Sequence, residues 1–92
     1  MHTSNEELKE IREKALERIS IGDHYYHYKN PDDLYEITDV GFQESDESVI
    51  IAYTALYGHG FTWYRQIDDF FGEKTLEDGT VVQKFVKVDY EK

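Results

Sequence analysis

The sequence predicts an α+β fold, in which an N-terminal helix is followed by a small SH3-like antiparallel β-barrel. Residues 1–21 follow a 3.6-residue hydrophobic period, whereas after Gly22 the period changes to 2 and β-branched and aromatic residues become frequent. Short consecutive strands with turn residues between them are typical of a meander that closes into a barrel, because closure removes exposed strand edges. A chain of 92 residues holds one domain with one core, which we divide into the helix (1–21) and the barrel (22–92).

The predicted helix has a start signal, an apolar stripe and a stop signal. Ser4-Asn5-Glu6-Glu7 fits a capping box, in which the first and last of these residues satisfy free backbone N–H groups. Gly22 is a typical helix stop. We expect the stripe to pack on the barrel or on a second copy of the helix, in which case the chain would form a homodimer. The residues of the stripe are Leu8, Ile11, Ala15 and Ile19.

Six strands are expected after the helix. Asp78-Gly79 is the strongest turn signal between them, because type I′ hairpin turns require positive φ. Residues 68–72 are less regular, and we expect a short 3₁₀ turn that places Phe70 or Phe71 in the core. The predicted strands are 24–29, 35–42, 49–57, 61–67, 73–77 and 80–88. The predicted barrel core consists of Ile37, Ile51, Tyr53, Leu56, Ile67 and Phe70.

Composition excludes several classes of function. The chain has 10 basic and 20 acidic residues, a net charge of −10, which disfavours binding to nucleic acid and to anionic membranes. No apolar run approaches the roughly 18–20 residues that span a bilayer, and no signal peptide is visible. The absence of cysteine excludes disulfides and thiolate chemistry. We expect a cytoplasmic protein.

Two isolated cations form the most informative pattern. Residues 22–73 contain eleven acidic side chains but only Lys29 and Arg65 as bases, and each base lies beside aromatic residues. Alternate residues of a strand share a face, so Trp63 should lie beside Arg65, where a guanidinium can stack on the indole or bind a carboxylate. In one interpretation the two cations meet at one end of the barrel and orient a ligand. In the other, Arg65 pairs with a carboxylate of a neighbouring strand, and Lys29 and His27 are surface residues.

Two segments carry a family motif. The first is Gly22 with Tyr25-Tyr26-His27-Tyr28-Lys29 and Leu34-Tyr35-Glu36-Ile37, and the second is Tyr53-Thr54-Ala55-Leu56-Tyr57-Gly58 with Trp63-Tyr64-Arg65 and Asp69-Phe70-Phe71. In this order and at this distance they resemble the DUF1653 family of bacterial domains, over about residues 22–86. Tyr26 stands where members often carry Arg, and Gln66 replaces the usual Pro. The resemblance implies a small, mostly β domain but no activity, because the family is named for its unknown function.

Other chemistry finds little support in the sequence. His24 and His27 are three residues apart, so on a strand they point to opposite faces and cannot share a metal ion. No serine lies in a nucleophile-elbow context, and the paired carboxylates fall in predicted loops or at strand ends. We therefore expect no enzyme activity, no metal and no cofactor.

The function that the sequence favours is non-catalytic recognition of a small anionic or carbonyl-bearing ligand or of a peptide. Aromatic rings would provide stacking area, and the two cations would orient the ligand. The alternative is a protein–protein interaction module that uses the helix or a barrel edge. The candidate ligand-binding residues are Tyr25, His27, Lys29, Tyr57, Trp63 and Arg65.

Overall fold

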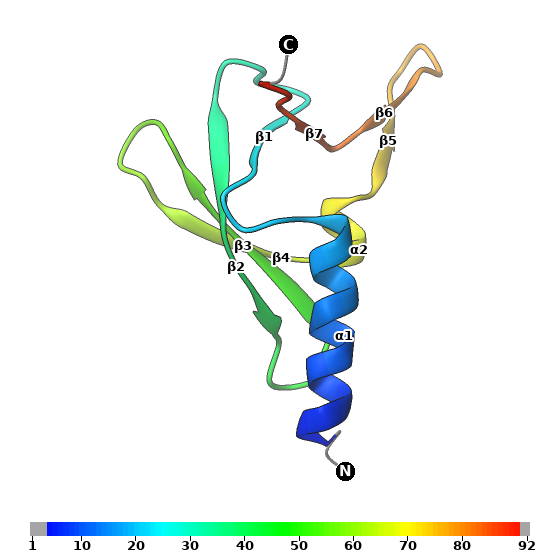
Figure 1. Ribbon diagram of the computed structural model, residues 1–92. Helices are drawn as coiled ribbons and strands as arrows, with labels where there is room; N and C mark the ends of the chain where they lie inside the picture. The colour runs from blue at the N-terminus through cyan, green and yellow to red at the C-terminus, as the bar shows by residue number, and fades with distance from the viewer. Residues whose placement is uncertain (1–3, 91–92) are drawn as a thin grey trace.

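The computed structural model describes residues 4–90 and shows an α+β arrangement of one long helix, a curved antiparallel sheet and a separate hairpin (Figure 1). The helices are α1 (Asn5–Arg18) and the one-turn α2 (Ile67–Phe70). The strands are β1 (His24–His27), β2 (Leu34–Phe42), β3 (Val49–Ala55), β4 (Thr62–Gln66), β5 (Glu73–Thr75), β6 (Val81–Gln83) and β7 (Phe85–Lys87). In this part of the chain no helix has the length and apolar character needed to cross a membrane.

Helix α1 begins at the predicted capping box. The Ser4 side chain accepts a hydrogen bond from the Glu7 N–H, and the Glu7 carboxylate accepts one from the Ser4 N–H. The helix ends at Arg18, earlier than the predicted residue 21, because Ile19 already has extended backbone angles. Ala15 and Ile19 are buried in the same core as the sheet, so α1 packs within its own chain.

One member of the predicted helix stripe does not face the sheet. Ile11 is 41% exposed. The adjacent Arg12 takes the inward place, and its Nε donates a 2.7 Å hydrogen bond to the Val40 carbonyl of β2. Because Arg12 makes this polar contact with the backbone of β2, Ile11 does not take the inward position. The hydrophobic period alone therefore predicted the wrong inward residue for this turn of the helix.

The sheet has the strand order β4-β3-β2-β1-β7 and is open, so the predicted closed SH3-like barrel is not observed in residues 4–90. The expected last strand, 80–88, is divided at Lys84 into β6, which pairs with β5, and β7, which pairs with β1. The β5–β6 hairpin stands away from the sheet (Figure 1), so it does not fill the gap between the two edges. A register shift between Ile37 and Asp39 of β2 marks a bulge, a feature that increases the local bend of a strand.

The core lies on the concave face of the sheet and is largely aromatic. Helix α2 places Phe70 there, fully buried, and its ring stacks on Phe85 at 4.4 Å with an interplanar angle of 7°. The buried residues Ile37, Ile51, Tyr53 and Phe70 confirm most of the predicted core, and Ile67 packs against it. Leu56 is 48% exposed, and its prediction as a core residue was wrong. Strict alternation along β3 turns Ile51, Tyr53 and Ala55 inward and leaves Leu56 on the opposite side.

Candidate functional site

The candidate site lies where the edge strand β4 meets α2. The register of β3 and β4 places Trp63 opposite Tyr53 and Arg65 opposite Ile51, so both β4 side chains lie on the concave face. This confirms that Trp63 and Arg65 share a face. Trp63 remains 53% exposed because β4 has a strand neighbour on one side only within residues 4–90.

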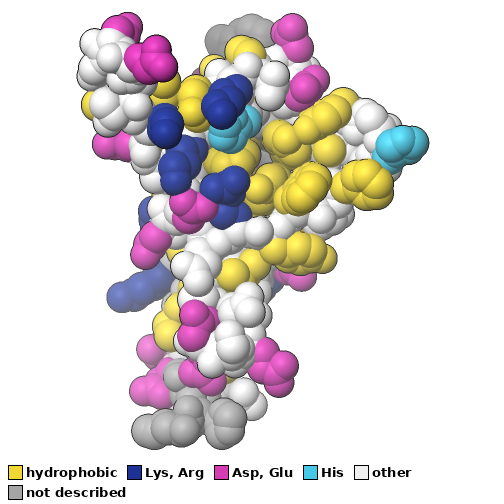
Figure 2. Space-filling model, turned by 180° about the vertical axis from the view of Figure 1, so that it is seen from behind, with side chains coloured by type: hydrophobic (Ala, Val, Ile, Leu, Met, Phe, Trp, Pro, Cys, Tyr) yellow, Lys and Arg dark blue, Asp and Glu magenta, His cyan; other side chains and the backbone are white. Residues whose placement is uncertain are grey.

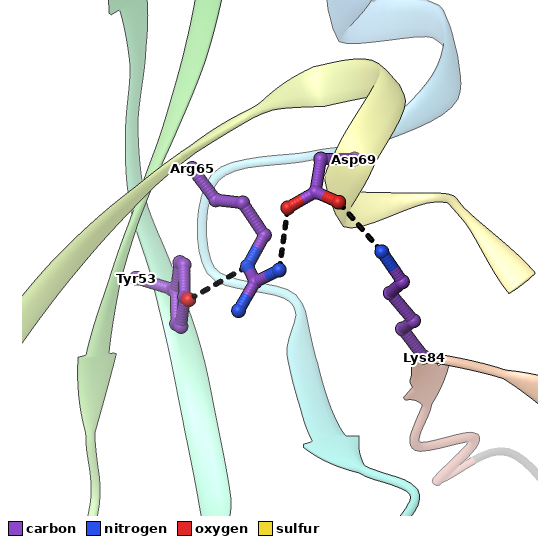
Figure 3. A network of polar contacts seen from close by, with 4 residues as sticks. All are labelled: Tyr53, Arg65, Asp69 and Lys84. Atoms are coloured by element: carbon purple, nitrogen blue, oxygen red, sulfur yellow. Dashed lines mark hydrogen bonds and ion pairs between the residues drawn. The ribbon is translucent and has the colours of Figure 1, made fainter. Parts of the chain in front are cut away.

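Arg65 is held by polar contacts on two sides (Figure 3). Its Nη1 pairs with Asp69 of α2 at 2.5 Å, and its Nε donates to the Tyr53 hydroxyl at 3.3 Å. The guanidinium carbon also lies 5.2 Å from the centre of the Phe85 ring. Arg65 therefore has the carboxylate partner that the second interpretation required, although that partner comes from a helix and not from a strand.

The Asp69 carboxylate bridges two cations. Its second oxygen accepts a 2.6 Å hydrogen bond from Lys84, which lies at the junction of β6 and β7. The hydrogen bond from Lys84, followed by the contact with Arg65, lowers the pKa of Asp69 below its ordinary value. Lys84 was not among the predicted site residues, because it reaches the site only through the exchange of partners between β6 and β7.

The pKa of the His27 imidazole is influenced by three positive charges. Its ring packs edge-on against Phe85 at 5.1 Å, and burial, followed by the charges of Arg65, Lys29 and Lys84, lowers the pKa of this imidazole. The charges of Lys29 and Arg65 thus both act on the same imidazole. Figure 2 shows Lys and Arg side chains gathered around a histidine, beside a patch of hydrophobic side chains.

The imidazole of His27 has a defined role in hydrogen bonding. The backbone N–H of Lys29 donates to His27 Nδ1 at 3.3 Å. A lowered pKa favours the neutral ring, and Nδ1 acts as an acceptor in this contact, so Nε2 carries the proton. The neutral imidazole thus offers one N–H donor and adds no positive charge. In the described part of the chain, the Lys29 ammonium forms no ion pair.

An open hollow of about 590 Å³ lies beside these groups. Four consecutive residues of β4 contribute to it, and they come from both faces of the strand, so the hollow extends across the strand edge. Its lining residues are Tyr53, Trp63, Tyr64, Arg65, Gln66 and Asp69. We call the side chains of His27, Lys29, Trp63, Arg65, Asp69 and Lys84 the β4 corner.

The two predicted tyrosines lie outside the hollow. Tyr25 is 4% exposed and contacts the rings of Phe70 and Phe71, so it belongs to the core. Tyr57 is 39% exposed, and its hydroxyl is 2.5 Å from that of Tyr35. Burial and the contact with Tyr57 raise the pKa of Tyr35 far above its ordinary value. Tyr57 thus contacts Tyr35 and is not among the residues that line the hollow.

The two histidines of the first strand have separate surroundings. His24 contacts Glu36 and Tyr90, whereas His27 contacts Phe85. Among residues 4–90, no three His, Asp or Glu side chains are grouped as a metal ion would require. The side chains that line the hollow offer aromatic rings, charge and hydrogen-bonding groups.

Comparison with known proteins identifies the family of the chain. A family model described as "Protein of unknown function (DUF1653)" matches residues 23–87, which include every strand and α2 but leave α1 outside. No curated protein and no solved structure matches. The match covers more than half of the sequence, and the chain belongs to the DUF1653 family.

Proposed function

We propose that this domain is a non-catalytic recognition module that binds a small anionic or carbonyl-bearing ligand, or a peptide, at the β4 corner. The observation that carries the proposal is the local charge. The Asp69 carboxylate pairs with both Arg65 and Lys84, and the charges of these two cations and of Lys29 all act on the His27 imidazole and lower its pKa. In a chain of net charge −10, this local excess of positive charge favours an anion at this place.

Arg65 retains hydrogen-bonding capacity for a ligand. Nε and one hydrogen of Nη1 are used by Tyr53 and Asp69, whereas Nη2 has no partner within residues 4–90. In Figure 3 no dashed line reaches the third guanidinium nitrogen. A planar guanidinium binds a carboxylate through two parallel N–H groups. The nearby Nε2–H of His27 supplies a neutral donor that suits a carbonyl oxygen.

The exposed rings supply the second component of recognition. Trp63 lines the hollow and is 53% exposed, and Tyr64 is 71% exposed. Solvent-exposed aromatic side chains next to a cation are typical of binding surfaces, since they provide large contact area with few rotatable bonds. A ligand with an apolar or aromatic group beside its anionic or carbonyl group would use both components.

The alternative of a homodimer through α1 receives less support. The inward residues of the helix, Ala15 and Ile19, are already buried against the sheet of the same chain. A partner would have to use the exposed Ile11 and Ile21, which are 41% and 51% exposed. The edge of β4, in contrast, has no strand neighbour on its outer side within residues 4–90.

The test uses the fluorescence of Trp63, the single tryptophan of the chain. N-acetylphenylalanine carries a ring and a carboxylate, and its amide carries the same ring without the charge. We expect saturable quenching or shift of the Trp63 emission by the acid and weaker binding of the amide. Replacement of Arg65 by Lys should weaken binding of the acid about tenfold, because the planar fork is lost.

Arg18→Lys is the matched control. Arg18 also has a carboxylate partner, Asp68, and a ring contact, with Phe71 at 4.6 Å, but it lies outside the hollow. Binding that is unchanged in Arg18→Lys and weakened in Arg65→Lys supports the proposal. No saturable response to either compound, or equal losses in the two variants, would overturn it.

A further inference from the structure

We infer that the ligand of the β4 corner is an extended peptide that pairs with the free edge of β4 and carries an Asp or Glu two residues from an aromatic side chain. This inference rests on the proposed function, because it uses Arg65 as the anion-binding group. It adds the class of the ligand, its backbone conformation and the spacing of its side chains.

The backbone of β4 has unused pairing groups along its edge. Ala55 N–H donates to the Phe61 carbonyl at 2.9 Å, which identifies Ala55 and Phe61 as a hydrogen-bonded pair. Hydrogen-bonded and non-hydrogen-bonded pairs alternate in an antiparallel ladder. By this alternation Trp63 and Arg65 bond to β3, whereas the N–H and C=O groups of Thr62 and Tyr64 point away from β3. In residues 4–90 no strand lies on that side.

The edge carries few of the features by which proteins protect such strands. Exposed edges are commonly blocked by lysine or another charged side chain, by proline, by a bulge or by very short length, and Arg65 is the one charged residue of β4. The sequence of β4 is Thr-Trp-Tyr-Arg-Gln, without lysine or proline, and its pairing with β3 shows no register shift. The other edge strand, β7, has three residues, follows Lys84 directly and ends in Lys87. An open edge beside a hollow that extends across it is the arrangement that β-strand addition uses.

The side chains of β4 fix the spacing of the peptide side chains. Trp63 and Arg65 are two residues apart and share the concave face. A paired peptide places its residues i and i+2 on that same face. An aromatic side chain of the peptide would then lie beside Trp63, and a carboxylate beside Arg65 and its unpaired Nη2. The residue between them would face the other side, next to Tyr64.

Charge selects this occupant over a second copy of the chain. Pairing of two β4 edges would bring two β4 corners close together, each with Arg65 and Lys84 on one Asp69 carboxylate and with Lys29 in no ion pair among residues 4–90. An acidic peptide instead supplies the charge that the corner attracts. The chain's net −10 repels such a peptide at long range, but this repulsion is screened beyond about 8 Å at physiological salt. Contacts at the corner therefore decide the affinity.

Two blocked peptides of equal composition test the spacing. The first is acetyl-Thr-Glu-Thr-Phe-Thr-Glu-Thr-amide, in which each Glu is two residues from Phe, so that either strand direction satisfies the geometry. The second is acetyl-Thr-Thr-Glu-Phe-Glu-Thr-Thr-amide, in which each Glu is one residue from Phe and falls on the opposite face. Titrations followed by Trp63 fluorescence should show the first peptide binding at least about tenfold tighter. Equal affinities would overturn the inference.

Backbone pairing is tested from the peptide side and from the protein side. Methylation of the backbone nitrogens of the two threonines next to Phe should weaken binding of the first peptide about tenfold. These N–H groups would face the outward groups of Thr62 and Tyr64, and their removal leaves the protein unaltered. Tyr64→Pro removes the outward N–H at an edge position, where proline is tolerated, and Tyr64→Ala controls for loss of the ring. Full binding of the methylated peptide would overturn edge pairing even if Tyr64→Pro fails to fold.

The binding results distinguish failure of the strand-addition inference from failure of the proposed recognition function. Binding of N-acetylphenylalanine that depends on Arg65, together with equal affinities of the two heptapeptides, would leave the recognition site standing and exclude strand addition. Failure of all four compounds to perturb Trp63 would contradict both.

Discussion

The concave face of the sheet has two parts that meet at the Phe85 ring. On one side Phe70 stacks on this ring at 4.4 Å, within a region where the side chains are apolar or aromatic and almost inaccessible. On the other side Arg65 lies 5.2 Å from the same ring, in a region of cations, an acid and half-exposed rings. The core part is built by packing alone. The β4 corner is built by charge pairing around an open hollow, and this arrangement is what a binding site requires.

The largest expected effect is the decrease in the free energy of unfolding when a side chain of the core part is truncated. Phe70→Ala removes a fully buried ring that contacts Tyr25, Tyr53 and Phe85, and it should lower the free energy of unfolding by about 3–5 kcal/mol. Leu56→Ala, at a 48% exposed position, should cost less than about 0.5 kcal/mol. Urea denaturation of both variants provides the measurement. Similar losses would contradict the buried position of Phe70 and the exposed position of Leu56.

The second effect concerns the contribution of α1 to the core. Ile19 is 2% exposed and packs in the core cluster, whereas Ile11 is 41% exposed. Ile19→Ala should therefore lower stability by roughly 2–5 kcal/mol, and Ile11→Ala should have a much smaller effect. Thermal unfolding at two protein concentrations distinguishes packing within one chain from a dimer. A melting temperature of the wild type that rises with concentration would favour the dimer through α1.

The core was more predictable from the sequence than the β4 corner. Ile37, Ile51 and Phe70 follow from strand alternation and from the short turn after β4, which are local patterns. The prediction of a closed barrel was wrong because residues 80–88 change their pairing partner at Lys84, from β5 to β1. This change depends on which strands these residues meet in the fold, and the hydrophobic period of the segment does not reveal it. The scarcity of positive charge in the sequence predicted that Lys29 and Arg65 converge, but it gave no indication of Lys84.

The ion-pair partner of Arg65 was also not identified by local sequence patterns. The sequence favoured a carboxylate from a neighbouring strand, and the actual partner is Asp69, four residues along the chain and on α2. Only the turn of the chain from β4 into α2 brings these two side chains together. Tyr25 was grouped with His27 by alternation, and the two do share a face, but Phe70 and Phe71 cover Tyr25 and leave it inaccessible.

The smallest expected effect on stability belongs to the β4 corner, and it depends on pH. Burial, followed by three positive charges, lowers the pKa of His27 below 6.5. A histidine whose pKa is lower in the folded state than in the unfolded state binds fewer protons when the protein is folded. The folded state is therefore fully favoured above the unfolded-state pKa and loses stability as the pH falls below it. We therefore expect stability to fall as the pH decreases from about 6.5 through the lower folded-state value, and the fall should be shallower when Arg65 is removed.

The central claim, that cations from separate segments of the chain converge on one imidazole, is tested most directly by NMR titration of His27. Wild type, Arg65→Gln and Arg18→Gln are compared; the third removes an arginine outside the β4 corner. The account predicts a His27 pKa below 6.5 in the wild type, an increase in Arg65→Gln because a repelling charge is lost, and no change in Arg18→Gln. A His27 pKa that is the same in all three proteins would contradict the convergence of charge at the β4 corner.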